Sequence, residues 1–421
     1  MFLFAFLSAL VFPGGASAGI RIDGRFDDWE EISPAWTAPP GDASPSGNGI
    51  LRVWTASGKK YLFLRFELGE EITLQSGNSL VLHLDTDGSA DTGFPVNGIG
   101  ADLSWHFGRR RGFVHADGRK VELNAYDLGI VSAPTVTSRQ FEVRIARDAA
   151  VPGVSSLFPA ESLRWVLMDG GRARGGSASV AVSSFDFDEK EGRGTPYQRI
   201  SMEKERPEYL RVMTYNVFND GLFRKRDSFS RILRAVGPDV INFQEISRHS
   251  PRQTGAVISR MLGGYWYAAG VGDTVTVSRY PIKEKRPVAG NVGVRLDLPD
   301  EKYADDLFII NAHLASGRND RRRQRQVDQI AFFIRVAKEP DGGMTLPPGT
   351  PILLVGDLNL VGRSRQLETL LTGDVEDNDA FGPDQPPDWD SSPLTDILAY
   401  HTCTPDVYTW WRKRERNGFG P

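Results

Sequence analysis

The sequence lacks three features, and each absence excludes a class of protein. It has one cysteine, Cys403, in 421 residues, so no disulfide can form within the chain and the fold depends on its hydrophobic cores. The formal net charge of −4 is too small to predict a polyanion partner from bulk charge. After residue 18, no segment is apolar enough to cross a membrane. With 40% apolar and 25% charged residues, the composition is that of a globular protein of roughly two or three domains.

The first 18 residues are the only apolar run of the targeting type. Residues 1–12 are almost wholly hydrophobic, Pro13 and two glycines interrupt the run, and Ala16-Ser17-Ala18 supplies the small residues of a cleavage site. No Lys or Arg precedes the run, which departs from the usual pattern. A membrane anchor is the alternative, but the run is too short to span about 30 Å of hydrocarbon. We therefore predict a signal peptide at 1–18 and a secreted or periplasmic protein without stable membrane insertion.

The chain then divides into two parts with different patterns. Residues 19–187 contain many short β-rich segments separated by turn residues, which predicts a β-sandwich. Residues 188–207 are charged and interrupted by Gly and Pro, as in a linker. In 208–421, strands at 210–217, 240–244, 307–311 and 352–355 alternate with helical segments such as 229–236, which predicts a layered α/β domain.

Four short polar motifs follow predicted strands in the second part. They are Met213-Thr-Tyr-Asn216, Asn242-Phe-Gln-Glu245, Asn311-Ala-His313 and Gly356-Asp357-Leu-Asn359. The ends of strands in an α/β sheet expose side chains to a shared cleft. Each motif alone is weak evidence, because Asn and Asp are common in turns and a lone histidine is often structural.

Together and in this order, the motifs resemble the endonuclease/exonuclease/phosphatase superfamily over about 209–408. The Ser278-Arg-Tyr-Pro-Ile282 turn and Arg323-x-x-Gln326 also resemble segments of that family. The resemblance implies a DNase-like four-layer α/β sandwich that hydrolyses phosphoester bonds with Mg²⁺ or Mn²⁺.

The resemblance also implies a role for each motif residue. Glu245 matches the metal ligand, and Asn216 matches an amide that binds the metal directly or supports the ligand. Asp357 would orient or deprotonate water or protonate the leaving oxygen, and Asn359 would bind the phosphate or hold Asp357. His313 would stabilise the phosphoryl oxygen or act as a general acid. A divalent cation suits this chemistry because it neutralises the charged oxygens that repel a nucleophile, and Mg²⁺ needs only a few hard oxygen ligands beside its waters.

The sequence departs from the family at its C-terminal end. Family members continue to a Ser-Asp-His motif whose histidine activates water, whereas this sequence stops at Pro421, and His401 comes too early to match. We therefore expect an incomplete final sheet with an unpaired edge, and a loss on the order of 10²–10⁴ in rate for want of that base. A fragment of an active enzyme and a naturally shortened, inactive homologue are both compatible with this ending.

The first part resembles carbohydrate-binding family 9 and DOMON-like modules. The resemblance rests on Ile20-Arg-Ile-Asp-Gly and the following Trp29, on the acidic segment at 84–93, and on Gly98-Ile-Gly-Ala-Asp102-Leu. It implies polysaccharide as a ligand, while Trp29 itself is expected in the core rather than against a sugar. Asp85, Asp87 and Asp91 are spaced like Ca²⁺ ligands, with an ordinary acidic turn as the alternative.

Two functions remain open at this point. The first is a secreted metal-dependent phosphoesterase acting on nucleic acid, a phospholipid head group or a small phosphate; the basic run Arg318–Arg325 is either a phosphate-binding patch or a solvated helix face. The second is an inactive pseudoenzyme anchored to polysaccharide or matrix through its β-module.

Overall fold

The computed structural model describes residues 19–39, 49–58, 60–116, 118–149, 151, 154, 156–170, 179–186, 203–340, 345–398, 406–407 and 409. The predicted signal peptide, most of the predicted linker, Cys403 and His401 lie outside these residues. The chain forms two compact units, one of Met1–Arg199 with Leu398–Pro421 and one of Ile200–Ile397. No helix in the described part of the chain has the length and apolarity to span a membrane.

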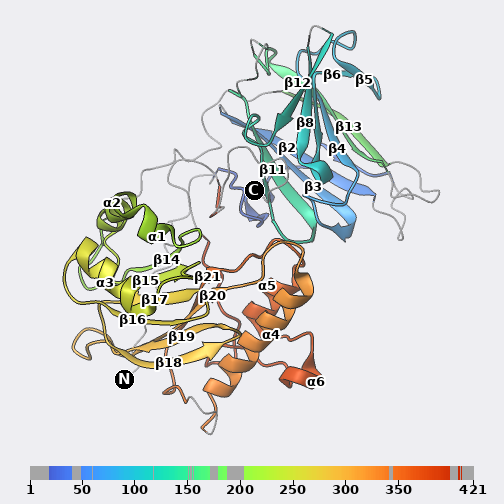
Figure 1. The fold of residues 1–421 in the computed structure, drawn as a ribbon. Helices are drawn as coiled ribbons and strands as arrows, with labels where there is room; N and C mark the ends of the chain where they lie inside the picture. The colour runs from blue at the N-terminus through green and yellow to red at the C-terminus, as the bar shows by residue number, and fades with distance from the viewer. Residues whose placement is uncertain are drawn as a thin grey trace. The chain divides into compact units, whose positions relative to one another are not determined.

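The first unit is built from antiparallel β-strands (Figure 1). One sheet has the order β1-β2-β3-β11-β10, and the other has the order β13-β12-β4-β7-β8-β9. The strands of the five-stranded sheet are β1 (Trp36–Thr37), β2 (Ile50–Ser57), β3 (Tyr61–Ile72), β10 (Val131–Ala133) and β11 (Ser138–Ala146). Those of the six-stranded sheet are β4 (Leu80–Asp85), β7 (Leu103–His106), β8 (Arg111–Ala116), β9 (Arg119–Asn124), β12 (Ser162–Asp169) and β13 (Ser179–Asp186). A two-stranded ribbon, β5 (Phe94–Val96) and β6 (Ile99–Ala101), and two 3₁₀ turns, Asp27–Trp29 and Phe107–Arg109, complete the unit.

Alternating apolar residues give the two sheets one shared core, in which Phe66 and Phe141 from one sheet meet Leu82 and Trp165 from the other. The expected β-rich N-terminal region is confirmed. Trp29 is fully buried, as expected, and its indole Nε1–H donates to Glu142 at 3.0 Å.

The ends of the described chain meet on the first unit. Glu142 also accepts from the backbone N–H groups of Asp23 and Gly24, and this fixes the N-terminal segment on the five-stranded sheet. Asp406 forms a bidentate ion pair with Arg144 on β11, with side-chain exposures of 0% and 7%. This buried pair anchors the segment around Asp406 to the first unit.

The second unit has two four-stranded sheets with helices on both outer sides (Figure 1). The first sheet, in the order β14-β15-β17-β16, contains β14 (Val212–Asn216), β15 (Val240–Gln244), β16 (Tyr267–Val271) and β17 (Thr274–Ser278). The second, in the order β18-β19-β20-β21, contains β18 (Ile282–Val288), β19 (Asn291–Leu296), β20 (Leu307–His313) and β21 (Ile352–Asp357). The helices are α1 (Gly221–Arg224), α2 (Arg226–Val236), α3 (Pro251–Leu262), α4 (Asp320–Ala337), α5 (Arg365–Thr372) and α6 (Asn378–Phe381).

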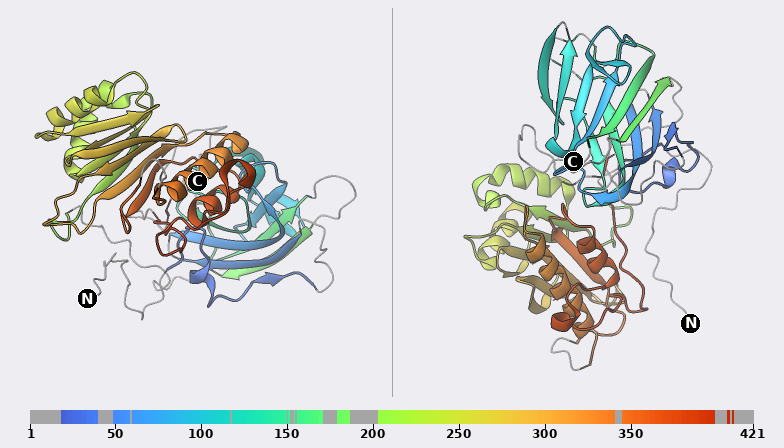
Figure 2. Two further views of the ribbon diagram at one scale, coloured as in Figure 1. Left: turned by 90° about the horizontal axis from the view of Figure 1, so that it is seen from below. Right: turned by 90° about the vertical axis from the view of Figure 1, so that its right-hand side faces the viewer.

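Three hydrophobic clusters hold these layers together. One joins α2 and α3 to the first sheet, one joins α4 and α5 to the second, and one lies where the two sheets face each other. Figure 2 shows the layers from two further directions. The mixed α/β structure expected for this part is confirmed, and each of the four predicted strands named above corresponds to a strand of the structure.

Candidate active site

The four polar motifs meet at one edge of the paired sheets. β14 runs parallel to β15, and β20 runs parallel to β21, so each pair presents its carboxyl ends on the same side. In these registers Asn216 lies beside Gln244, and His313 lies beside Asp357. This arrangement brings Asn216 into hydrogen-bond contact with Asp357, which lies 141 positions later in the sequence.

Two carboxylates share the side-chain amide of Asn216. Its Nδ2 donates to Glu245 Oε1 and to Asp357 Oδ2, each at 2.9 Å. The amide oxygen accepts from the backbone N–H of Phe218 at 2.9 Å, and this donor fixes which end of the amide faces the carboxylates. In this arrangement the Asn216 amide nitrogen supports the two acids, and its oxygen faces the N–H of Phe218. Of the two roles that the resemblance implied for Asn216, the geometry fits the supporting one.

Glu245 is held in an uncommon backbone conformation. Its φ is 64°, and the adjoining loop residues Phe218, Asn219 and Asp220 are also left-handed, with φ between 48° and 59°. The backbone N–H of Asn219 donates to Glu245 Oε2 at 2.7 Å, and the N–H of Asp220 bonds the carbonyl of Glu245 at 2.8 Å. Such conformations cost free energy in residues other than glycine, and they often occur at functional sites. The loop and Glu245 therefore form one unit that fixes the carboxylate.

His313 is oriented by two hydrogen bonds. Its Nδ1 lies 2.8 Å from Asp273 Oδ2, and its backbone N–H donates to Asn291 Oδ1 at 2.7 Å. Its Nε2, the other ring nitrogen, is 4.0 Å from Asp357 Oδ2. The hydrogen bond to the Asp273 carboxylate raises the pKa of His313, whereas burial lowers it. The negative charges of Asp273, Asp357 and Glu245 raise the pKa further. The side chain is 19% exposed, so a protonated Nε2 could reach a bound anion.

Asn359 lies beside the cluster but does not point into it. Its backbone N–H donates to Asp357 Oδ1 at 3.3 Å, and its side-chain Nδ2 donates to the carbonyl of Leu314 at 3.0 Å. It therefore joins the segment after β21 to the segment after β20. The tight packing here requires a glycine before Asp357, because a Cβ on Gly356 would lie 1.8 Å from the carbonyl oxygen of Ala312.

Three other polar residues of the motifs, Asn242, Gln244 and Asn311, are buried beneath the site. Gln244 Nε2 donates to Asn311 Oδ1 at 2.7 Å, Asn311 Nδ2 donates to the carbonyl of Phe243, and Thr276 donates to Asn242 Oδ1 at 2.8 Å. These side chains are at most 1% exposed. These hydrogen bonds link the two sheets and offset the cost of burying the polar groups. Its effect is to hold the strand ends in register.

Arg323 is structural and does not belong to a surface patch. It is fully buried, and its guanidinium bonds Gln366, Asp320 and the carbonyls of Ala315 and Gly317. Gln326 accepts from the N–H of Ala315 at 2.8 Å. The predicted Arg-x-x-Gln segment thus fixes the loop that follows His313. Its exposed neighbours on the same run are Arg318, Arg321, Arg322 and Arg325.

A divalent cation fits the donor set of this site. Glu245 is half-buried and Asp357 is 34% exposed, and neither carboxylate is neutralised by a Lys or Arg among the described residues. A carboxylate oxygen with one hydrogen bond keeps a lone pair for a metal. Mg²⁺ requires few protein ligands because it retains several waters.

A second acidic group lies in the first unit. Asp85, Asp87 and Asp102 form the only cluster of three or more metal-binding side chains within 4.8 Å in the described part of the chain. The sequence suggested Asp91 as the third member, but the structure replaces it with Asp102. The Asp102 carboxylate accepts from Thr86 and from the N–H of Asp87, while Asp85 pairs with Arg164.

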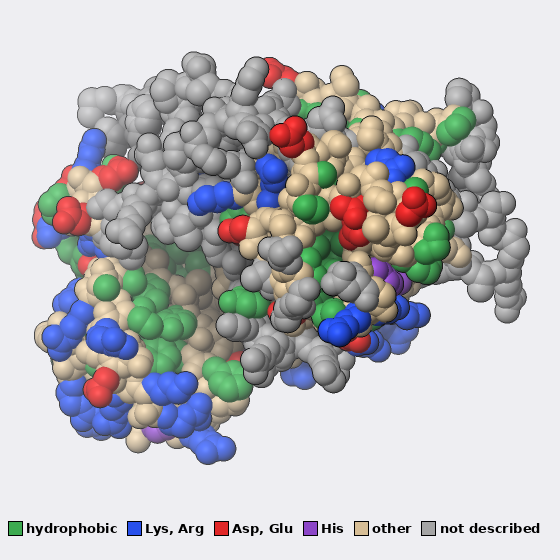
Figure 3. All heavy atoms as spheres, turned by 90° about the horizontal axis from the view of Figure 1, so that it is seen from above, with side chains coloured by type: hydrophobic (Ala, Val, Ile, Leu, Met, Phe, Trp, Pro, Cys, Tyr) green, Lys and Arg blue, Asp and Glu red, His purple; other side chains and the backbone are tan. Residues whose placement is uncertain are grey.

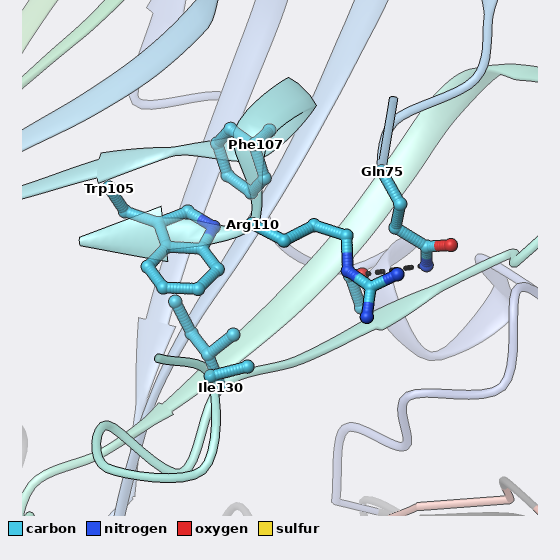
Figure 4. A pocket seen from close by; sticks show the side chains of 7 residues that line it. Gln75, Trp105, Phe107, Arg110 and Ile130 are labelled. Carbon is cyan, nitrogen blue, oxygen red and sulfur yellow. Dashed lines mark hydrogen bonds between the residues drawn. The ribbon is translucent and has the colours of Figure 1, made fainter. Parts of the chain in front are cut away.

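A small internal cavity also lies in the first unit, lined in part by Trp105, Phe107, Arg110 and Ile130 (Figure 4). Its volume is about 10 Å³, which is room for one water molecule. The cavity is too small for an organic ligand.

Two functional contributions were not anticipated from the sequence. Asp273, the partner of His313, lies in the β16–β17 hairpin turn after Gly272, where Gly-Asp is an ordinary turn sequence. Asn219 contributes its backbone N–H, and its identity indicates only a left-handed turn (φ 51°). Neither residue could have been identified without the three-dimensional arrangement.

Comparisons with known proteins find a family similarity in the second part of the chain. Residues 213–420 match the model of the Endonuclease/Exonuclease/phosphatase family. No curated protein sequence matches the chain.

Solved structures with partial likeness include a β-hairpin deletion mutant of beta toxin from Staphylococcus aureus (17% identity, 36% of this chain and 68% of that chain, TM-score 0.28). The human Nocturnin catalytic domain (14%, 36% and 65%, 0.29) and sphingomyelinase C from Streptomyces griseocarneus (20%, 36% and 64%, 0.26) are similar to a like extent. These scores are too low to bear on substrate or mechanism. The family match covers residues 213–420, a little under half of the chain, and this similarity favours a phosphoesterase or nuclease type of function.

Proposed function

We propose that the chain is a divalent-metal-dependent phosphoesterase with Asn216, Glu245, His313 and Asp357 at its active site. The observation that carries the proposal is the shared amide of Asn216, which holds the carboxylates of Glu245 and Asp357 together. Two acids fixed side by side at strand ends, next to an oriented histidine, suit the hydrolysis of a phosphoester.

Each side chain has a role that follows from its contacts. Glu245 would hold Mg²⁺ or Mn²⁺, because its carboxylate is fixed by Asn216 and Asn219 and the residue is only half-buried. When bound, the metal supplies positive charge that neutralises the phosphoryl oxygens and the developing negative charge. Asp357 is placed to orient an attacking water, since Asn216 and the N–H of Asn359 fix both of its oxygens.

His313 would stabilise the phosphoryl oxygen. Its Nδ1 is committed to Asp273, and the raised pKa favours the imidazolium form, so Nε2 can donate to an anion near Asp357. Asn359 fixes the loop that carries Asp357.

We further propose that the protein is exported, from the pattern of residues 1–18, and that the first unit is a β-sandwich that binds polysaccharide, from its sequence resemblance. Ca²⁺ is a candidate ligand of the Asp85 cluster. Ca²⁺ binding there would raise the melting temperature of the first unit in the full chain, and an Asp102→Asn variant would lose this effect. An unchanged melting temperature would mean that the cluster does not bind Ca²⁺ and is an ordinary acidic turn.

The test of the phosphoesterase activity is hydrolysis of bis-p-nitrophenyl phosphate by the full chain with Mg²⁺. We expect Glu245→Gln to lower the rate by about 10²-fold or more, and EDTA to abolish it. Glu376→Gln is the matched control, because Glu376 is an exposed acid outside the four motifs that pairs with Arg363. Equal rates for the unmodified chain and Glu245→Gln, or no metal-dependent hydrolysis by either, would refute the proposed activity. The alternative of an inactive binding protein would then hold.

A further inference from the structure

A dense set of basic side chains covers the helices beside the proposed site. Residues 221–264 contain eight Lys and Arg residues, all exposed, and one exposed acid, Asp227. We call these eight side chains the basic ridge: Arg224, Lys225, Arg226, Arg231, Arg234, Arg248, Arg252 and Arg260. They lie on α1, α2 and α3 and on the loop between β15 and α3. Lys and Arg side chains crowd the lower left of the view in Figure 3, where acidic groups are few.

The ridge is not neutralised by the protein. None of its eight side chains forms an ion pair with a carboxylate of the described residues. Some other cations of the same unit are paired, as Lys283 is with Asp297 and Arg365 with Asp374. The partners that the structure gives to the ridge are backbone carbonyls, such as that of Met261 for Arg234. Concentrated charge of one sign repels itself, and a bound polyanion would relieve that repulsion.

The ridge is continuous with the proposed site. Arg224 donates to the carbonyl of Phe218, at 2.9 Å, and to that of Asn219, whose own N–H holds Glu245. The N–H of Arg248, three residues after Glu245, donates to Asp220 in the same loop. A polyanion on the ridge would therefore lead directly to the carboxylate that we propose holds the metal.

One exposed aromatic ring marks the junction. Phe218 is 69% exposed, although it lies two residues after Asn216 and its backbone N–H donates to the Asn216 side chain. A large apolar ring exposed beside a phosphate site and a cationic surface is the arrangement that binds single-stranded nucleic acid, with phosphates on the cations and a base on the ring. A lipid surface would require several apolar side chains to insert, whereas along α1–α3 only Ile232 adds a large exposed aliphatic group.

We propose that the basic ridge binds the backbone of a single-stranded nucleic acid and guides it to the active site, where Phe218 stacks on a base. This inference rests on the proposed function, and it names nucleic acid as the substrate class of that same site.

The test measures binding of a fluorescent oligothymidylate of about 20 nucleotides to the full chain in EDTA, by anisotropy, over roughly 50–200 mM KCl. The ridge variant is Arg231→Gln/Arg252→Gln/Arg260→Gln, which changes three exposed helical residues outside the catalytic set. The matched control is Arg318→Gln/Arg321→Gln/Arg322→Gln, which removes three exposed arginines at the start of α4. Hydrolysis of bis-p-nitrophenyl phosphate is measured on the same proteins.

We expect the ridge variant to bind about 10-fold more weakly or worse, with a slope of log K against log salt shallower by about 2, because each lost phosphate contact contributes about 0.7 for a single strand. The control should keep its affinity, and both variants should hydrolyse the small substrate at the unmodified rate. Phe218→Ala should lower affinity for the oligonucleotide by roughly 10-fold, the loss of one stacked base.

Unchanged binding by the ridge variant, or an equal loss in the control, would overturn the inference. So would ridge-dependent binding to phosphatidylserine/phosphatidylcholine vesicles without binding to the oligonucleotide. A failure of the proposed function would give a different result. In that case Glu245→Gln would hydrolyse the small substrate as fast as the unmodified chain.

Discussion

Replacing Asn216 with alanine tests whether one amide holds the proposed catalytic carboxylates together. In the structure its Nδ2 is the shared donor to Glu245 and Asp357, at 2.9 Å from each. Without it, two negative groups face each other with no bridge, and each turns toward water. The active site would then have to be reorganised before the substrate and metal could bind in a productive arrangement.

The size of the effect follows from the type and exposure of these bonds. A hydrogen bond to a charged group contributes about 1.5–3 kcal/mol. Asp357 is 34% exposed and water replaces part of the lost bond, so the lower end of that range applies. Two bonds at about 1.5 kcal/mol give about 3 kcal/mol, or roughly 100-fold in kcat/KM at about 1.4 kcal/mol per decade.

The assay is hydrolysis of bis-p-nitrophenyl phosphate over a range of Mg²⁺ concentrations. Asn216→Ala should lower kcat/KM by roughly 100-fold, and Asn216→Asp should lower it further because it adds a third negative charge. Asn378→Ala is the control, since Asn378 is an exposed residue of α6. A kcat/KM for Asn216→Ala within about threefold of the unmodified value would refute the bridging role.

Three other predictions concern the support of the site and of the first unit. Asp406→Ala should destabilise the first unit by about 3–5 kcal/mol in urea denaturation of the full chain, because it leaves Arg144 buried without its partner, whereas Arg144→Met/Asp406→Leu should recover most of that loss. Asp273→Asn should lower the pKa of His313 in an NMR titration of metal-free protein. The stability that this pair contributes is fully present below about pH 6.5, is lost as pH rises through the raised pKa of His313, and should be absent from the variant. Arg323→Met should cost about 3–5 kcal/mol and lower activity, since it frees the loop after His313.

The sequence predicts which segments form strands and that the four polar motifs meet, because both depend on the local pattern of residues. Alternating apolar residues defined β15 and β20, and polar residues directly after such strands have to meet at a sheet edge. Asn216 ends one strand of the first sheet, Glu245 follows another, and Asp357 ends a strand of the second. Their contact through the Asn216 amide follows once the two sheets pack together.

What the sequence concealed depends on contacts between distant segments. The orientation of the Asn216 amide is set by the backbone N–H of Phe218, which no side-chain pattern records. Asp273 appears as an ordinary turn residue until β16 and β17 place it beside His313. Asp102 joins Asp85 because β4 pairs with β7.

Charge was misleading for a similar reason. The contiguous run Arg318–Arg325 attracts attention in the sequence, yet its central Arg323 is buried and structural. The basic ridge is spread over 37 residues of sequence, from 224 to 260, and folding of α1–α3 gathers it on one surface. Charge spacing along a chain therefore predicts surface potential poorly when helices lie between the charges.

The central claim is that Glu245, supported by Asn216 and next to Asp357, holds a divalent cation at the ends of the strands. The most direct measurement is anomalous diffraction from crystals of the full chain soaked in Mn²⁺. We expect an anomalous peak in contact with the Glu245 carboxylate that is absent from Glu245→Gln crystals. A peak confined to Asp85, Asp87 and Asp102, with none beside Glu245 at saturating Mn²⁺, would contradict it.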